Sequence, residues 1–300
     1  MATQQRSRSR RPSSSRQQGP RHVEAILDPT WQSPYAPSIT ERESHQSALR
    51  HYVVSRKRGE MGVASIVVLA LIAGVVVSPW LLVIGVVVAV GVALDVRRYM
   101  MAIERRAAEL GPFMHSTFTA GGTPKDHQRL TTVIDRLTAT FGVDAVSAFI
   151  IEDPGYNAAL VPHESNYAFF VTAALMRDFE LIELEGVVAH CLARQRLGVV
   201  ARQSYSAVVT ASNDRRRVLA GPGLGYRADE VAAAAIRYPL GLSGALRRCA
   251  RQVVPAHSFF SSKQYDQWRF VFFDMGSDRT QSDLGDLDDV ELRALALEEW

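Results

Sequence analysis

A histidine and a cysteine lie together in a segment whose spacing could support metal chemistry. Residues 187–194 have the sequence VVAHCLAR, in which His190 precedes Cys191 and Arg194 follows one helical turn later. In the zinc-binding motif H-E-x-x-H, two histidines at i and i+4 lie on one helical face and hold Zn²⁺, while the glutamate activates the metal-bound water. Only the first histidine of that motif is present here. Taken alone, His190 is better interpreted as a buried histidine of an amphipathic helix.

The segments around His190 occur in an order that a single buried histidine does not explain. His190 is preceded by an apolar run and by a short acidic segment at the expected start of a helix. It is followed by a segment that ends in aspartate and then by a predicted helix that begins with proline. Several motifs in a fixed order are more specific than one histidine. In chain order they are IIEDPGYNAA at 150–159, YAFFVTAALM at 167–176, LIELEG at 181–186, GYRAD at 225–229 and YPLGLSGAL at 238–246.

This order of motifs resembles the membrane zinc metallopeptidases of the HtpX and CAAX-prenyl-protease group. The resemblance covers about Asp126 to Leu246, and LRAL at 292–295 is similar to that family's C-terminal R-I-x-x-L segment. It implies an α+β, mainly α fold, with a zincin-like metallopeptidase domain that follows an N-terminal transmembrane helical hairpin. It also implies a peptide groove beside two strands. The groove residues would be Asn157, Ala158, Ala159, Asn166 and Val171.

The family's metal and catalytic positions match this chain only in part. His190 stands at the first zinc ligand, and Asp229 stands at the aspartate that supports the ligand histidines. Cys191 replaces the general-base glutamate, Arg194 replaces the second histidine, and Gly225 replaces the third ligand, a glutamate. A thiol near zinc is a ligand rather than a base, an arginine has no lone pair to offer, and a glycine has no side chain. We therefore expect no intact catalytic residue and no bound metal or cofactor.

Arg194 and Asp229 suggest what could replace the metal. A cation stands at the position of a metal ligand, and the neighbouring carboxylate is retained. We therefore predict that Arg194 fills the vacated metal space and pairs with Asp229. The alternative, which is compatible with this pairing, is that Asp229 caps a helix that begins near Val231.

The resemblance and the altered positions together predict a catalytically inactive, membrane-anchored, metallopeptidase-like protein. It would act as a peptide- or protein-binding or regulatory module at the cytoplasmic membrane face, with an exposed strand edge at the groove capturing an extended peptide without cutting it. One alternative is an active zinc-dependent endopeptidase with a ligand set rebuilt around His190 and Cys191. Another alternative is a structural membrane protein.

Composition predicts an intracellular, basic chain. The two cysteines of the 300 residues, Cys191 and Cys249, form neither a disulfide framework nor a C-x-x-C site, which indicates a reducing compartment. Residues 1–60 are polar and basic, with no acidic residue before Glu24, so we expect a disordered cytoplasmic tail. No aromatic side chains lie between its first arginines to stack on bases, and we expect no specific nucleic-acid partner.

An uncharged apolar run follows the tail and is typical of a membrane segment. A single helix of this length would measure about 50 Å, whereas the hydrocarbon core is about 30 Å thick. Because Pro79 ends a helix and Trp80 favours the interface, we predict a transmembrane hairpin over residues 61–95. Its spans would be about 61–77 and 80–94. Basic residues flank both ends, which predicts a multi-pass protein of the cytoplasmic (inner) membrane with both termini cytoplasmic and the lipid bilayer as a partner.

Residues 96–125 are predicted to form a connecting helix and a Gly-rich linker, and residues 126–300 the metallopeptidase-like domain with an acidic C-terminal tail. Apolar spacing predicts the elements of this domain. Helices are expected at about 126–141, 180–197, 202–218 and 228–253, strands at about 145–152 and 157–170, and a strand or buried packing segment at 268–273.

Overall fold

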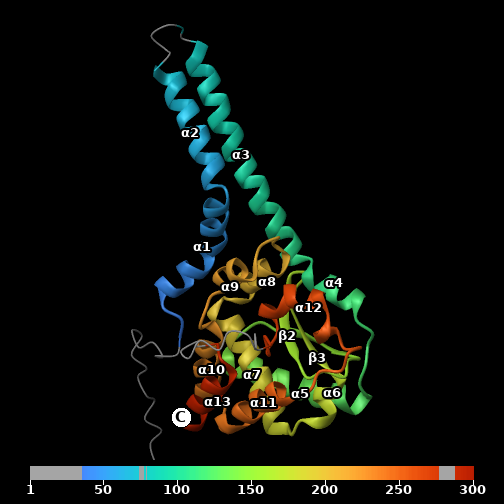
Figure 1. Ribbon diagram of the computed structural model, residues 1–300. Coiled ribbons are helices and arrows are strands. Elements are labelled where there is room, and N and C mark those ends of the chain that lie inside the picture. The colour runs from blue at the N-terminus through green and yellow to red at the C-terminus, as the bar shows by residue number, and fades with distance from the viewer. Residues whose placement is uncertain (1–35, 74–77, 79, 277–287) are drawn as a thin grey trace, which may run out of the picture. The chain divides into compact units, whose positions relative to one another are not determined.

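The fold is described from a computed structural model that covers residues 36–73, 78, 80–276 and 288–300. The chain divides into residues 1–33, which lie outside the described part, and a second unit, residues 34–300, to which all that follows refers. This unit is a mainly helical α+β structure with one small sheet of three strands (Figure 1). The predicted α+β, mainly α class is therefore confirmed.

In the described part of the chain, five helices precede the sheet. α1 (Ile39–Arg56) begins with a capping box, in which Ser38 and Glu41 satisfy each other's backbone N–H groups. It buries Ala48, Leu49 and Val53 against α3 and α8. The predicted disordered tail is therefore wrong from Ile39 onward, because this apolar spacing gives the helix a face to bury; residues 1–35 lie outside the described part.

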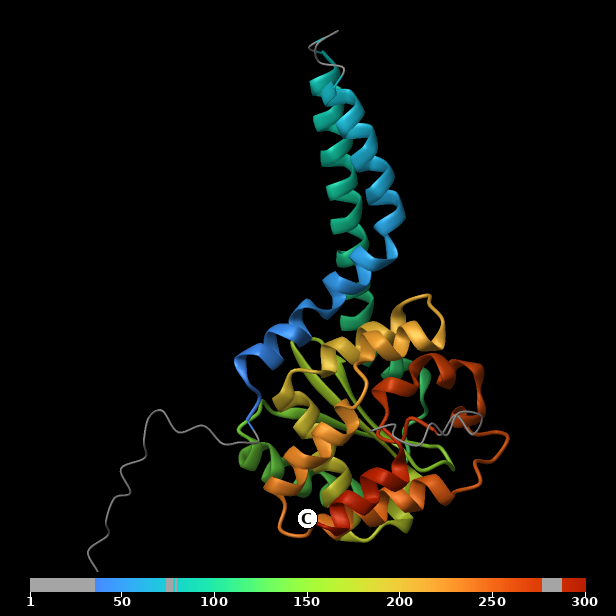
Figure 2. The same cartoon turned by 60° about the vertical axis from the view of Figure 1, so that its left-hand side comes forward.

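α2 (Arg58–Ala73) and α3 (Trp80–Ala108) lie side by side (Figures 1 and 2). α3 runs without a break across the predicted boundary at residue 95, and residues 77 and 79 of the predicted break at 77–80 lie outside the described residues. The two helices turn large apolar side chains outward. Among those at least half exposed are Val63, Ile66, Leu69, Ile72, Trp80, Val86, Val87 and Val90. In the described part of the chain, no helix combines the length and the apolar character needed to cross a membrane.

The sheet has the order β1-β3-β2. β1 (Val146–Ile151) runs parallel to β3 (Asn166–Thr172), and β2 (Ala158–His163) runs antiparallel to β3. The predicted strand at 157–170 is thus a hairpin of two strands, with Ala158 opposite Val171 and His163 opposite Asn166. The turn between them holds Glu164 at a positive φ of 52°.

Both faces of the sheet are buried, and the side chains alternate between them. Leu160, Phe169 and Val171 pack with α5 (Pro124–Phe141) and α7 (Leu181–Leu197), whereas Val161 and Phe170 pack on the opposite side with α4 (Leu110–Thr117) and α8 (Val200–Val208). This alternation follows from the period of two residues in a strand. Because helices cover both faces, the strands are apolar along most of their length.

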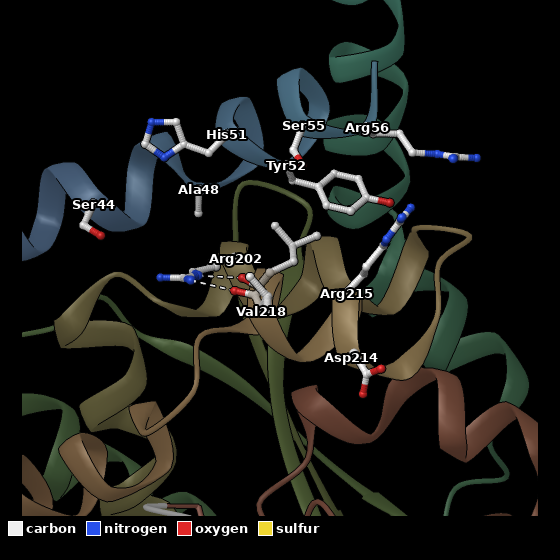
Figure 3. Close-up of a pocket in the computed structure, with 11 residues that line it drawn as sticks. Ser44, Ala48, His51, Tyr52, Ser55, Arg56, Arg202, Asp214, Arg215 and Val218 are labelled. Atoms are coloured by element: carbon white, nitrogen blue, oxygen red, sulfur yellow. Dashed lines mark hydrogen bonds between the residues drawn. The ribbon is translucent and has the colours of Figure 1, made fainter. Parts of the chain in front are cut away.

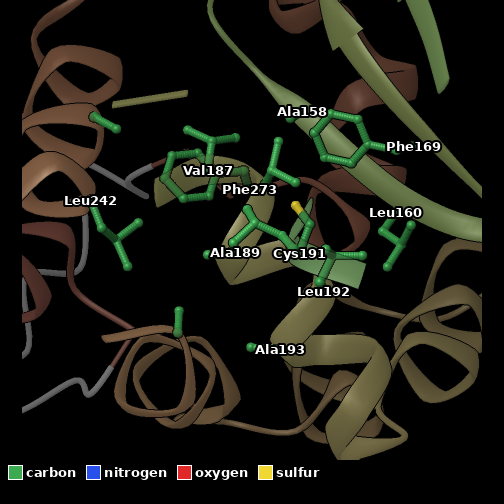
Figure 4. Packing of buried hydrophobic residues seen from close by; sticks show 14 of the residues in the cluster. Ala158, Leu160, Phe169, Val187, Ala189, Cys191, Leu192, Ala193, Leu242 and Phe273 are labelled. Carbon is green, nitrogen blue, oxygen red and sulfur yellow. The ribbon is translucent and has the colours of Figure 1, made fainter. Parts of the chain in front are cut away.

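The central helix α7 is buried almost all round (Figure 4). It contacts β2 and the helices α5, α10 (Leu224–Ala235) and α11 (Pro239–Arg251). A close approach to α11 depends on Gly186, since a Cβ atom there would lie 2.7 Å from the backbone N and Cα of Leu242. A helix that is apolar on every side belongs in a core, and α7 is the element that carries the histidine segment into it.

The remaining predicted elements agree with the structure except where a break was missed. The helices expected at 126–141 and 180–197 and the strand at 145–152 are confirmed by α5, α7 and β1. The single helix expected at 228–253 is wrong, because Pro239 starts a new helix, and the one at 202–218 is likewise divided. The other elements are α6 (Ala173–Asp178), α9 (Asn213–Ala220), α12 (Lys263–Trp268), α13 (Val290–Glu298), η2 (Phe259–Ser261) and η3 (Arg269–Val271).

Candidate functional site

The histidine segment lies in the middle of α7, and the structure buries all three of its polar side chains. The exposed fractions are 2 % for His190, 0 % for Cys191 and 1 % for Arg194. α7 is bounded by a capping box at Glu180 and Glu183 and by Gly198, whose φ of 75° ends the helix. The helix is therefore held firmly at both ends, and its polar groups must find partners inside the protein.

His190 is bound to Asp229 of α10. The distance between His190 Nδ1 and Asp229 Oδ1 is 2.7 Å, and Phe273 packs edge-on against the imidazole with the ring centroids 5.2 Å apart. Burial lowers the pKa of His190 to about 4, so the ring is neutral near pH 7. Because an ionised carboxylate only accepts, Nδ1 carries the proton and donates it to Asp229. This is the tautomer that a metal-binding histidine with a supporting carboxylate would adopt.

The cation that pairs with Asp229 is Arg293 of α13. Arg293 Nε donates to Asp229 Oδ2 at 2.6 Å and Nη2 donates to Oδ1 at 3.1 Å, so the contact is bidentate. Burial by itself would raise the pKa of Asp229, but the Arg293 charge and the bond from His190 outweigh it, and the pKa lies below its ordinary value. The predicted pair of Arg194 with Asp229 is wrong, and so is the alternative that Asp229 caps a helix, since it lies within α10.

Arg194 instead contacts the segment that follows α12. Its Nε donates to Oε1 of Gln203 at 2.6 Å, and its Nη1 donates to the carbonyl of Val271 at 2.9 Å. A third bond, of 3.4 Å, runs from Nη2 to the carbonyl of Phe270. Arg194 is thus buried in the interior near His190, as expected, but its hydrogen bonds hold residues 270–271 against α7. Asp229 is paired with Arg293 instead.

Gly225 marks the space that Arg293 occupies. A Cβ atom at Gly225 would lie 3.4 Å from Cζ and from Nη1 of Arg293, and 3.0 Å from Oδ1 of Asp288. The residue at this position therefore faces the guanidinium directly. A longer side chain such as glutamate would have to displace Arg293, and the absence of a side chain at Gly225 is what leaves room for the pair with Asp229.

The residues of this site do not fit a zinc ion. His190 and Asp229 carry donor atoms, but Gly225 beside them has no side chain, and the adjoining space holds the fixed positive charge of Arg293. A divalent ion about 5 Å from a guanidinium would be repelled by several kcal/mol even at an effective dielectric constant of about 20. Among the residues that the structure describes, no group of three or more His, Cys, Asp or Glu side chains could hold a metal.

Cys191 does not supply a ligand or a base in place of the missing groups. Its side chain lies among apolar residues such as Leu160, Phe169 and Phe273 (Figure 4). Burial raises the pKa of the thiol to about 11, and the nearby Arg194 charge offsets only part of this. The thiol therefore stays protonated near pH 7, and the form that binds metals or attacks substrates is not populated.

The predicted groove residues lie beside a strand edge that the chain itself covers. Asn157, Ala158, Ala159 and Val171 are adjacent, whereas Asn166 lies at the opposite end of the β2–β3 hairpin. The expectation of an open edge at Ala158 and Ala159 is wrong, because Phe273 N donates to the Ala158 carbonyl at 2.7 Å and Phe272 forms a bridge with Ala159. Peptide binding by these residues stays a prediction.

Asn157 fixes this covering segment in place. Its side-chain Nδ2 donates to the carbonyl of Asp274 at 2.9 Å, and its Oδ1 accepts from Asp274 N at 3.0 Å. Residues 270–274 therefore lie between β2 on one side and α7 on the other, where Arg194 holds Phe270 and Val271. We call residues 270–274 the covering segment.

Two parts of this site were missed at the level of sequence. Arg293 was noted only for its similarity to a family segment, yet a lone arginine in the apolar run LRALAL is itself a signal of a buried ion pair. The aromatic residues 268–273 were expected to be a strand or a packing segment, and their packing is confirmed, but no local signal showed that they cover β2. Comparison with protein-family models, with curated proteins and with solved structures finds no match to this chain.

Proposed function

We propose that this chain is a membrane-anchored protein with a zincin-like metallopeptidase domain that lacks peptidase activity and works as a protein- or peptide-binding module. The observation that carries the proposal is the buried bidentate pair of Arg293 with Asp229, which puts a permanent cation in the space beside His190. The histidine and its supporting carboxylate are retained, but an arginine takes the part of the metal in compensating the carboxylate charge. Peptide hydrolysis by activation of a metal-bound water has no support from this set of residues.

The proposed membrane anchor is the pair of helices α2 and α3. Soluble domains rarely expose contiguous apolar surface of the kind that these two helices carry. Lys57 and Arg58 precede the apolar part of α2, while Arg97 and Arg98 occur in the second half of α3. Basic residues at both bases of the pair favour insertion from the cytoplasmic face, with the domain and both termini on that side of the inner membrane.

The proposed binding role rests on the edge of β2 that faces the covering segment. This edge already accommodates a chain segment through backbone hydrogen bonds, which is the way a sheet edge recognises an extended peptide. A partner in trans would have to displace the covering segment. Binding would therefore be controlled by the contacts of Asn157 and Arg194 that hold this segment.

The first test is metal content and proteolysis of the full chain purified in a neutral detergent. We expect no stoichiometric zinc after exposure to an excess of Zn²⁺ and no cleavage of unfolded casein. Stoichiometric zinc that is lost in His190→Ala would contradict the proposal and favour the endopeptidase with a rebuilt ligand set. The variant Arg293→Leu then asks whether the guanidinium is what keeps the ion out.

The second test is binding of a labelled peptide with the sequence of residues 268–273, which leaves out Asp274, to the full chain. Asn157→Ala removes both side-chain bonds to Asp274, so we expect tighter peptide binding than in the unchanged protein and faster amide exchange at Phe273. A peptide of scrambled sequence serves as the ligand control, and Asn166→Ala, at the far end of the hairpin, serves as the protein control. No binding by any of these proteins would contradict the proposed module.

A further inference from the structure

A cavity lies between α1 and α9, away from the His190 site (Figure 3). Its volume is about 440 Å³, which is within the range of small-molecule sites. Side chains of α1 form one wall, and those of α8 and α9 form the other. The function proposed above makes no use of it.

The lining of this cavity is strongly basic. It is lined by Arg56 of α1, Arg202 of α8 and Arg215 of α9. Among the described residues that line the cavity, Asp214 is the one acidic residue. Arg202 is already engaged, because it donates to the carbonyls of Leu219 and Val218 at 2.6 and 2.9 Å. Arg56 and Arg215 make no hydrogen bond or ion pair with any residue of the described ranges, so their donors are available to a ligand.

The floor of the cavity is apolar. Ala48 and Leu219 are buried there, and they belong to the small hydrophobic cluster that joins α1 to α3 and α9. Tyr52 adds its ring, and its hydroxyl points toward the side of the cavity where Arg56 and Arg215 lie (Figure 3). Cationic donors above an apolar floor fit an amphipathic anion better than a fully hydrated one.

The position of the cavity along the chain identifies the source of such an anion. Arg56 is the last residue of α1, and α2 with its exposed apolar side chains begins two residues later at Arg58. If α2 and α3 insert in a membrane, as proposed above, Arg56 and the cavity lie at the level of the lipid headgroups. An anionic leaflet would then present phosphate groups to this site at high local concentration.

We propose that the cavity between α1 and α9 is a binding site for the phosphate headgroup of an anionic phospholipid. Arg56 and Arg215 contact the phosphate, as guanidinium groups commonly do through paired N–H donors. Ala48, Tyr52 and Leu219 contact the glycerol and the first carbons of the acyl chains. This inference rests on the membrane anchor of the proposed function for the position of the site, but not for its chemistry.

The test uses the full chain in a neutral detergent and short-chain lipids that do not form bilayers. Calorimetric titration with dihexanoyl phosphatidylglycerol is expected to show saturable one-to-one binding, whereas dihexanoyl phosphatidylcholine and glycerol 1-phosphate bind at least about tenfold more weakly. Arg56→Gln combined with Arg215→Gln should weaken phosphatidylglycerol binding by about tenfold or more, since each cation near a headgroup contributes about as much as a few-fold change in affinity. The matched control, Arg237→Gln combined with Arg251→Gln, removes two arginines outside the cavity and should leave binding unchanged.

A second variant separates a defined cavity from diffuse attraction between charges. Val218→Phe keeps every charge and enlarges a side chain that lines the cavity and is 65 % exposed, so the fold tolerates it. The proposal expects weaker binding in this variant. Unchanged binding, or equal losses in the two double arginine variants, would overturn it. Binding of glycerol 1-phosphate as tight as that of the lipid would overturn the assignment to a lipid and identify a soluble phosphate compound.

Failure of the membrane anchor is recognised by a separate measurement. Flotation of the unchanged protein with vesicles of pure phosphatidylcholine reports insertion of α2 and α3 without any anionic headgroup. Flotation without calorimetric binding overturns the lipid site alone. Calorimetric binding without flotation overturns the anchor and leaves the site chemistry supported.

Discussion

Replacement of Arg293 by leucine is expected to destabilise the fold strongly. Arg293 and Asp229 are 1 % and 3 % exposed, and their two hydrogen bonds are 2.6 and 3.1 Å long. Arg293→Leu leaves the Asp229 carboxylate buried with His190 as its remaining side-chain donor among the described residues. Removal of one partner from a buried ion pair costs about 3–5 kcal/mol, because the other charge is left uncompensated, and we expect a loss in this range.

Urea unfolding of the full chain in neutral detergent at pH 7, followed by circular dichroism, measures this loss. Asp229→Asn combined with Arg293→Leu removes both charges and should cost clearly less than Arg293→Leu alone. Arg247→Leu is the matched control, since its carboxylate partners Glu291 and Glu298 are partly exposed and such a pair contributes about 0–1 kcal/mol. A cost for Arg293→Leu no larger than that of Arg247→Leu would refute the argument that Arg293 compensates a buried charge.

Three further predictions concern α7. The pKa of His190 is about 4 in the folded protein and 6.5 in an unfolded chain, so between these pH values only the unfolded chain takes up a proton at this residue. We therefore expect the free energy of unfolding to fall by about 3 kcal/mol as the pH falls from 7 to 4. Urea unfolding at a series of pH values measures this dependence, and His190→Gln should remove most of it. Gly186→Ala should cost about 1–3 kcal/mol in the same assay, because the added Cβ would lie 2.7 Å from the backbone of α11. Cys191 and Cys249 should not react with a maleimide at pH 7 until urea unfolds the chain, since both thiols are buried and their pKa values are raised.

Each of these predictions has an internal control. His257→Gln changes an exposed histidine and should leave the pH dependence intact. Gly244→Ala, on the α11 side of the same interface, places its Cβ no closer than 3.4 Å to another atom and should be tolerated. A slope that survives in His190→Gln, a neutral Gly186→Ala, or fast labelling of the native thiols would each show that α7 is packed more loosely than its burial indicates.

Several elements of the fold could be predicted because their signals are local. Helices α5 and α7 show apolar residues at helical spacing, and β1 is a short apolar run bounded by polar residues. The boundaries between consecutive helices were harder to predict. At Pro239, apolar residues at helical spacing continue on both sides, so the proline is the one local signal that a new helix begins there. α1 was missed since its basic, serine-rich surroundings concealed a face of only a few apolar residues.

The family resemblance, which the order of the motifs carries, predicted the group of residues around His190, and the residue types at positions 191, 194 and 225 predicted that this group would not form a zinc site. It also predicted that an arginine would compensate Asp229, and it identified the wrong one. Arg194 is one turn from His190 on the same helix, whereas Arg293 is distant in sequence and reaches Asp229 only because α13 packs against α10 and α11. Which of two buried arginines meets a carboxylate depends on the packing of helices, and so does the covering of β2 by residues 270–274. Both are long-range contacts, which the types and spacing of neighbouring residues do not encode.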